Sequence, residues 1–295
     1  MKISNTPTTR LRSGLVSAGA VAALAIGVLG ATPAADAAVS GGADYTCGTP
    51  LGDITVPVEV SSPALPESVA TGFTVPGGML PAGVTITVPA DFAATIKFFG
   101  VTAIGGSSGD FDLGLGSVAV PIDALSIAPV EIVDGEDVVL PAKAAVGSFV
   151  TPEPGVQALT LPSSFSFDAV NQNNEPVSTL TCALTDPTTA EFGSVSVIKQ
   201  TSSLNAKAAK KKIKKSERAK ITATVVREFG GDATGKVVAA EGKKTLGSSK
   251  VKANKATLKL AKLKPGKHKI VLTYLGDSAT DGNTAKVTIK VTKKK

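Results

Sequence analysis

The residue type most suggestive of chemistry occurs once: His268 is the only histidine in the 295-residue chain, within "GKHKIVLTYLGD". A catalytic histidine needs an orienting acid or a neighbouring nucleophile, and no acid or hydroxyl is spaced around His268 to suggest such a relay. In an extended segment His268 shares its side with Ile270, Leu272 and Tyr274. We therefore predict a packed or capping histidine on the inner row of a strand, and a core Tyr274 whose hydroxyl reaches backbone near a strand corner.

The densest charge run, "KAAKKKIKKSERAK" (207–220), has two open interpretations. It is either a solvated linker and first strand edge, whose lysines discourage edge-to-edge pairing, or a grip on acidic wall polymers or anionic lipid headgroups. Nucleic acid is disfavoured because nearly all the basic residues are lysine, without Arg forks or interleaved aromatic residues. The polyanion contacts would be Lys210, Lys211, Lys212, Lys214 and Lys215.

Acidic residues gather in "SSGDFDLGLG" (107–116) and "VDGED" (133–137), which offer oxygens to calcium but lack EF-hand spacing. Asp110 and Asp112 share a side if extended, as paired glycosidase carboxylates might, although aromatic sugar platforms are scarce in a chain with no Trp and two Tyr. No nucleophile elbow, zinc-protease motif or phosphate-cradling glycine loop is present. We predict no catalytic residue, cofactor or metal, and therefore no enzyme.

The beginning of the chain is typical of a secretory signal. Three basic residues precede an uncharged run rich in Ala, Val and Leu (14–30), and "ATPAADAA" offers a small-residue cleavage site. We predict a signal peptide over residues 1–37, cleaved between Ala37 and Ala38. The alternative is an uncleaved anchor, for which the run is short of the roughly 20 residues of a span. No transmembrane anchor is expected in the mature chain, which we place outside the cell or at its surface.

Both cysteines, Cys47 and Cys182, belong to the exported part and are 135 residues apart. In an oxidising compartment such a pair indicates a disulfide, with two free thiols or intermolecular pairing as the alternatives. Two cysteines and one distant histidine cannot supply the four ligands of a structural zinc site. The chain-entropy model values a closure of this length at roughly 4–5 kcal/mol.

Charge divides the chain sharply. Residues 38–198 carry 17 Asp and Glu against two basic residues, a net charge of −15, whereas residues 199–295 carry 26 Lys and Arg against six acids, a net charge of +20. Such a shift predicts a boundary near residues 195–205, giving domains at 38–198 and 199–295. Opposite charges also allow neighbouring molecules to pair head to tail.

Four segments of the basic part alternate apolar and polar residues with a period of two: "AKITATVV", "KATLKLAKL", "HKIVLTY" and "AKVTIKVT". Turn-forming sequences such as "KPGK" and "GDSATDGN" separate such segments. This pattern predicts antiparallel strands with one buried face. About seven such strands fit the length, which favours a sandwich of immunoglobulin type.

"LKPGKHKIVLTYLGD" and "TGKVVAAEGKKTLGSSKVKANKATLKLAKL" resemble the signature of bacterial Ig-like repeat domains of secreted actinobacterial proteins. The resemblance covers roughly residues 200–293. It implies a spacer, stalk or adhesive module and brings no catalytic residues. This copy departs from the family pattern mainly in its lysine content.

The acidic part contains apolar, β-branched segments such as "GVTITVPADFAATIKFFGV" and "DVVLPAKAAVGSFVTP", and predicts a β-sandwich of about seven to nine strands clipped by the disulfide. Its "YTCGTPLG" start and "TCALTDP" end resemble an actinobacterial exported domain often found ahead of Ig-like repeats. That resemblance covers about residues 43–198 and implies no known activity.

Together these observations predict an all-β protein with two β-sandwich domains, the C-terminal one immunoglobulin-like, behind a cleavable signal peptide. We predict a secreted or cell-surface structural, adhesive or binding protein without catalytic activity, held to anionic cell-wall polymers by its Lys-rich module. Glycans and surface proteins are further candidate partners, and nucleic acid is not one. The alternative is an exported enzyme or a glycan- or ligand-binding protein with its site in the acidic domain and the Ig-like domain as carrier.

Overall fold

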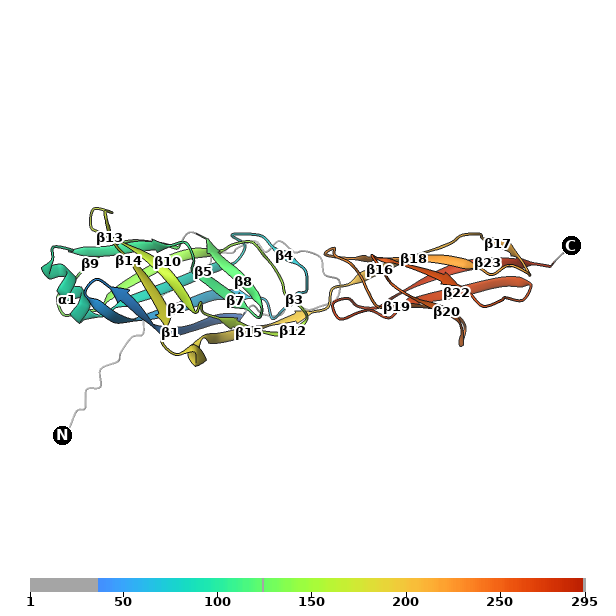
Figure 1. The fold of residues 1–295 in the computed structure, drawn as a ribbon, viewed down its shortest axis with the longest axis horizontal. Helices are drawn as coiled ribbons and strands as arrows, with labels where there is room; N and C mark the ends of the chain where they lie inside the picture. Colours follow the sequence, from blue (N-terminus) through green and yellow to red (C-terminus); the bar gives the residue numbers. More distant parts are fainter. Residues whose placement is uncertain (1–36, 124, 294–295) are drawn as a thin grey trace, which may run out of the picture. The chain divides into compact units, whose positions relative to one another are not determined.

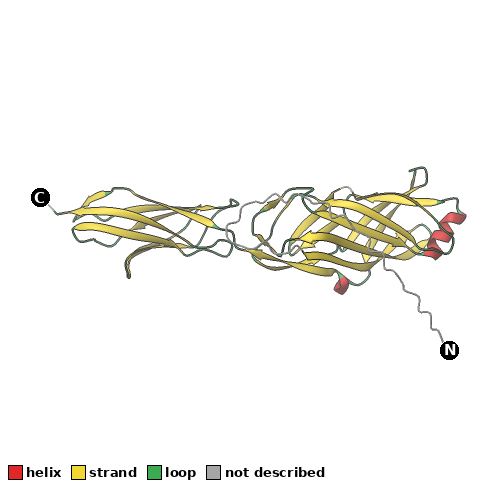
Figure 2. Ribbon diagram, turned by 180° about the vertical axis from the view of Figure 1, so that it is seen from behind, coloured by secondary structure: helices red, strands yellow, loops and turns green. Residues whose placement is uncertain are grey.

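The computed structural model describes residues 37–123 and 125–293 (Figures 1 and 2). These residues form 23 strands, one α-helix and a short 3-10 helix (Pro187–Thr189), so the predicted all-β class is confirmed. The predicted signal peptide lies outside the described residues except for Ala37, where the first strand begins. Below, residues 38–198 are called the acidic region and residues 199–295 the basic region.

The acidic region is built on one 13-stranded sheet with the order β3-β15-β12-β7-β8-β10-β5-β2-β1-β14-β13-β6-β9, and on a pair formed by β11 and β4. Its strands are β1 (Ala37–Thr49), β2 (Gly52–Leu65), β3 (Ser68–Ala70), β4 (Thr74–Val75), β5 (Pro81–Val88), β6 (Ala103–Ser108), β7 (Asp112–Leu115), β8 (Val118–Asp123), β9 (Leu125–Glu131), β10 (Val138–Val146), β11 (Phe149–Val150), β12 (Gly155–Thr160), β13 (Ser164–Asn171), β14 (Pro176–Leu184) and β15 (Glu191–Ile198).

The 13-stranded sheet curls back on itself, because β9 at one edge contacts β10, and β15 near the other edge contacts β1. The curl encloses a core whose largest buried side chains are Tyr45, Phe111, Leu125 and Leu140. The expectation of seven to nine strands was too low for this region. Two of the strands, β4 and β11, span only two residues and are too short to show an alternating pattern.

A helix, α1 (Ala90–Phe98), interrupts a segment that the sequence analysis had assigned to β-structure. Pro89 follows the last residue of β5, has an extended conformation (φ −61°, ψ 143°) and immediately precedes the helix. The Ala90 N–H donates to Asp137 Oδ1 at 2.8 Å, which satisfies one of the unpaired donors of the first turn. Burial of Ala93 and Ile96 against the core then holds α1 in place, and tertiary packing overrides the β-branched residues around it.

The predicted disulfide is confirmed. Cys47 on β1 lies directly opposite Cys182 on the neighbouring β14, and their sulfurs are bonded. Beside it, the buried Tyr45 packs edge-on against Phe165, and its hydroxyl donates to the Pro162 carbonyl at 2.6 Å. Desolvation raises the pKa of Tyr45 well above its usual value. The covalent link and the buried tyrosine therefore fasten the first strand of the acidic region to its last third.

The basic region has a three-stranded sheet, β16-β18-β21, and a five-stranded sheet, β17-β23-β22-β19-β20. Its strands are β16 (Ser202–Ala208), β17 (Lys212–Lys214), β18 (Lys220–Arg227), β19 (Lys236–Glu241), β20 (Lys244–Lys250), β21 (Lys255–Lys259), β22 (Gly266–Tyr274) and β23 (Asn283–Thr292). The two sheets share a core of their own, which includes Ile221, Leu258, Ile270 and Ile289. The four segments predicted from their alternation are all strands with one buried row.

Tyr274 is fully buried as predicted, but its hydroxyl does not reach backbone. It donates to Asp277 Oδ2 at 3.0 Å, and the same carboxylate accepts the Thr234 N–H at 2.8 Å and the Ala279 N–H at 3.0 Å. Burial by itself would raise the pKa of Asp277, yet these hydrogen bonds outweigh it and lower the pKa to about 2. Asp277 thus closes the turn after β22, where the sequence offered only a turn signal.

We expect replacement of both cysteines by alanine to lower the free energy of unfolding by about 3–5 kcal/mol, because the unfolded chain regains the entropy of a 135-residue loop. Urea denaturation followed by circular dichroism measures the change. Thr181→Ala, an exposed change next to Cys182, is the control and should leave stability within about 0.5 kcal/mol. Reduction of the wild type should reproduce the loss; a double variant as stable as the oxidised wild type would contradict the account.

Candidate functional site

Six exposed lysines share the outer side of β17, β22 and β23. The inward residues of these strands, such as Ile213, Ile270 and Ile289, are buried, so the alternate positions must face outward. None of the three strands contains Asp or Glu. We call this surface the lysine face: Lys212, Lys214, Lys267, Lys269, Lys286 and Lys290.

Three of these lysines form one row across the sheet. Lys212 pairs with Lys290 in the parallel β17–β23 ladder, and Lys290 pairs with Lys267 in the antiparallel β22–β23 ladder. Neighbouring strands lie about 4.8 Å apart, and like charges placed directly opposite one another destabilise a sheet. The row is therefore a concentrated positive site held together by the buried side of the same strands.

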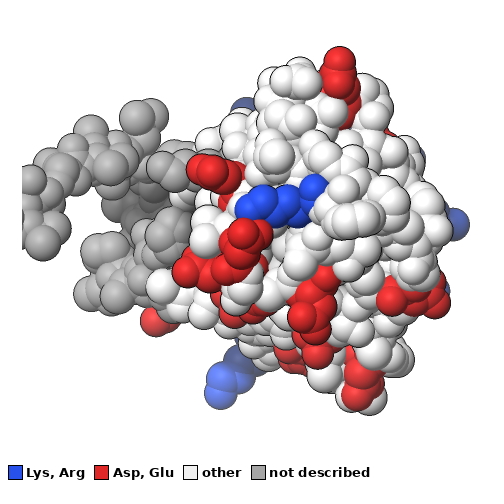
Figure 3. All heavy atoms as spheres, turned by 90° about the vertical axis from the view of Figure 1, so that its left-hand side faces the viewer, with Lys and Arg blue, Asp and Glu red and all other residues white. Residues whose placement is uncertain are grey.

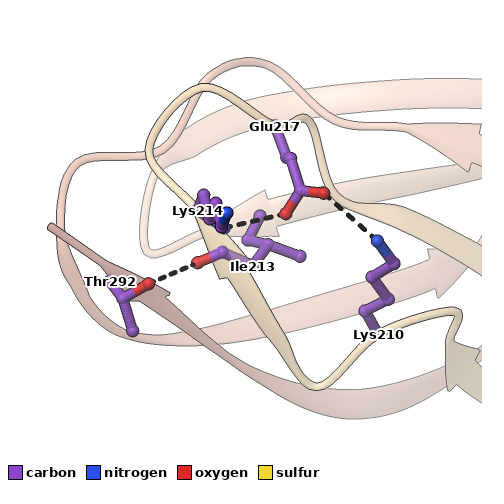
Figure 4. A network of polar contacts seen from close by, with 5 residues as sticks. All are labelled: Lys210, Ile213, Lys214, Glu217 and Thr292. Carbon is purple, nitrogen blue, oxygen red and sulfur yellow. Dashed lines mark hydrogen bonds and ion pairs between the residues drawn. The ribbon is translucent and has the colours of Figure 1, made fainter. Parts of the chain in front are cut away.

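The lysine-rich segment 207–220 is ordered around Ile213 and Glu217 (Figure 4). Ile213 is buried, and its carbonyl accepts the Thr292 hydroxyl of β23 at 3.2 Å. The Glu217 carboxylate accepts the Lys214 N–H at 2.8 Å and Lys210 Nζ at 3.1 Å. The hydrogen bond from the Lys214 backbone is the main reason that the pKa of Glu217 is lowered. The segment thus folds as an edge strand followed by a turn, and the backbone that carries its exposed lysines is held in place.

The structure distributes the five predicted contact residues unequally. Lys212 and Lys214 belong to the lysine face, and Lys211 and Lys215 flank the same short strand with exposed side chains. Lys210 is paired with Glu217 and is partly neutralised. Lys267 and Lys290 could not be predicted as contact residues from sequence, because their alignment with Lys212 depends on strand pairing between distant segments. Their exposed parity in two alternating strands was the available signal.

The acids of the basic region are engaged within their own structure, which leaves most of its positive charge uncompensated. Among the described residues of this region, Lys210 is the only lysine in a salt bridge. Five of the six acids accept hydrogen bonds from nearby turns or side chains: Glu217, Glu228, Asp232, Glu241 and Asp277. A partner supplying negative charge would therefore meet free lysines.

His268 lies half-buried between two acceptors. Its Nδ1 is 2.9 Å from Glu241 Oε2, and its Nε2 is 2.7 Å from the Lys264 carbonyl oxygen. Both contacts are satisfied at once when the ring carries two protons, because a carbonyl can only accept. Hydrogen bonding to Glu241 raises the pKa of His268 above its usual value, although burial acts against it. The arrangement ties β22 to the end of β19.

Three of the acidic candidates from the sequence, Asp110, Asp134 and Asp137, have structural partners. Asp110 accepts the Ser166 N–H at 2.8 Å and the Ser108 hydroxyl at 3.1 Å, and the first of these bonds is the main cause of its lowered pKa. Within residues 37–123 and 125–293, no group of three or more His, Cys, Asp or Glu side chains is arranged to hold a metal ion. In the same residues, no helix has both the length and the apolar character needed to cross a membrane.

Two family models match the chain. Residues 44–193 match the family of unknown function DUF6801, and residues 185–292 match the bacterial Ig-like domain (group 3). The first match covers half of the sequence. The chain belongs to the DUF6801 family. Its DUF6801 domain corresponds to the curled sheet with the disulfide, and the Ig-like domain that follows carries the lysine face.

No curated protein matches the chain. Among solved structures, a Corynebacterium diphtheriae protein provisionally described as membrane anchored has 16% sequence identity and a TM-score of 0.39; the match covers 88% of this chain and 59% of that one. The fibronectin(III)-like modules of Clostridium thermocellum CbhA have 18% identity and a TM-score of 0.28, with 80% and 94% covered. The Escherichia coli adhesin FdeC has 14% identity and a TM-score of 0.25, with 88% and 86% covered. Likenesses at these values carry no information about function.

The raised pKa of His268 predicts a pH-dependent stability. The stabilisation from its ion pair is fully present below the unfolded pKa of about 6.5 and is lost as the pH rises through the higher folded pKa. His268 is the only histidine, so its ring signals in an NMR titration of untagged protein are unambiguous. Glu241→Gln should lower the titration midpoint, whereas the control Glu228→Gln should not. A wild-type midpoint at or below about 6.5 would contradict the ion pair.

Proposed function

We propose that this is an exported, non-catalytic binding protein whose Ig-like domain attaches it to anionic polymers at the cell surface. The cross-strand row of Lys212, Lys290 and Lys267 is the observation that carries this proposal. Export is supported by the signal-like start of the chain, and the disulfide fits an oxidising location. On this view the chain divides near residues 198 and 199, where the charge changes sign.

A polyanion suits the lysine face better than a single small anion does. Each lysine presents a compact charge on a flexible stem, which makes strong electrostatic contact without requiring one fixed geometry. A polymer with repeated phosphates or carboxylates can contact several of these ammonium groups together and relieve the repulsion between opposite lysines. Wall polymers and acidic glycans of the cell surface have this chemistry.

Neutralising the three lysines of the row should weaken attachment far more than expected from the fraction of the domain's positive charge that they supply. We expect the triple variant Lys212→Gln, Lys267→Gln, Lys290→Gln to bind a wall polymer such as teichoic acid about tenfold or more weakly at about 50 mM salt. Biolayer interferometry on immobilised polymer measures the dissociation constant. Wild-type binding should fall steeply as salt rises to about 500 mM, since screening shortens electrostatic interactions.

A charge-matched control separates the row from overall charge. Lys207→Gln, Lys243→Gln, Lys262→Gln removes three exposed lysines that lie apart in the sequence, on β16, in the β19–β20 turn and in the loop after β21. None of them is paired with another lysine in a ladder, and we expect a change of less than about threefold. Equal losses from both triple variants would reduce the effect to bulk charge. Binding insensitive to salt, or absent at low salt, would remove the proposed attachment altogether.

A further inference from the structure

An open apolar pocket of about 210 Å³ lies beside α1 in the acidic region. It is formed where the β1–β2 turn, α1 and β14 meet, and its walls are almost entirely carbon, as shown by Leu51, Phe92, Ile96, Phe99, Val177 and Leu180. Figure 3 views the α1 end of this region, where large uncharged areas lie among scattered acidic groups.

The rim of the pocket keeps large apolar side chains in solvent. Phe99 is 66% exposed, Leu51 is 53% exposed and Val177 is 45% exposed, although each lines the pocket. The preceding residue, Phe98, is 87% exposed, and its ring meets that of Phe99 edge-on at 5.6 Å. Soluble proteins seldom gather exposed apolar side chains around a hollow unless something binds there.

The pocket offers apolar contact with little hydrogen bonding. The Thr49 hydroxyl at its edge donates to the Gly52 carbonyl at 2.6 Å. A smaller apolar void of about 20 Å³ lies deeper, towards the disulfide, and shares Phe92, Ile104 and Leu180 with the pocket. The lining therefore favours the hydrocarbon part of a ligand.

Charge around the rim selects the rest of the ligand. Asp53, Asp91 and Glu175 are exposed and lie within two residues of pocket-lining side chains. The nearby Lys97 is already held by Asp134 at 2.7 Å and by the Ile132 carbonyl at 3.1 Å. With a net charge of −15 on residues 38–198, an anionic head group would be repelled, whereas a neutral or cationic one would not.

We propose that this pocket binds the apolar group, an aliphatic chain or a single aromatic ring, of a neutral or cationic small molecule. The site is independent of the lysine face: it has the opposite surrounding charge and lies in the DUF6801 domain.

The neutral fluorophore N-phenyl-1-naphthylamine serves as the probe, with the full purified chain. We expect enhanced fluorescence on binding, and about tenfold weaker binding in Phe99→Ser, which removes a ring from the pocket wall. Phe98→Ser is the matched control, because Phe98 is the more exposed neighbour and does not line the pocket; its affinity should stay within about twofold. Both positions are exposed, so neither variant should unfold the chain.

Displacement of the probe tests the charge selection. At about 20 mM salt, decyltrimethylammonium should displace it at several-fold lower concentration than decanoate, and the difference should shrink at high salt. The proposal fails if Phe99→Ser binds the probe as the wild type does, if Phe98→Ser loses as much, or if decanoate displaces it better. Light scattering that shows a dimer dissociated by Phe99→Ser would instead assign the rim to self-association.

Discussion

The buried side of each strand in the Ig-like domain determines where its lysines lie. Ile213, Ile289 and Ile270 are buried on three adjacent strands. Side chains alternate between the two sides of a strand, so the residues next to these isoleucines in sequence face solvent. Burial of these side chains fixes the register, and the register in turn brings Lys212, Lys290 and Lys267 opposite one another. Hydrophobic packing on the other side of the same sheet thus holds the three lysines together against their mutual repulsion. A bound polyanion would relieve this repulsion without changing the packing.

The few acids of this domain serve its turns, which is why they do not neutralise its surface. Asp277 closes the turn after β22 with a strongly lowered pKa, Glu217 organises the turn after β17, and Glu241 holds the only histidine. Each carboxylate is fixed by hydrogen bonds whose loss would cost local structure. Positive charge is consequently spread over the strands, where contact with a partner requires no rearrangement of the fold.

Local patterns in the sequence predicted those features that depend on residue type and short-range spacing. Alternation identified four strands of the Ig-like domain, and two cysteines in a chain with a signal-like start indicated the disulfide. Strand pairing could not be predicted from the sequence. For example, Glu241 contacts His268 because β19 pairs with β22 at Ala240 and Val271, and these segments are about thirty residues apart. Helix α1 was not predicted, because the β-branched residues around it outweighed the Pro-Ala-Asp start. The pocket could therefore not be predicted either, since it depends on Phe92, Ile96 and Phe99 at this helix. Residue types can therefore be assigned to strands from sequence, while sites built from several strands need the register.

The opposite charges of the two regions have a consequence for selectivity. A polyanion attracted to the lysine face would be repelled by the net charge of −15 on residues 38–198, so its contact would be confined to the Ig-like domain. A cationic amphiphile would have the reverse preference, since the lysines repel a cation while the acids close in sequence to Leu51, Phe92 and Val177 do not. A neutral amphiphile is repelled by neither region. Attachment to a polyanion and binding of a small molecule would then not compete for the same surface. Added salt would strongly weaken the attachment but would leave the apolar part of small-molecule binding intact, because burial of carbon does not depend on screening.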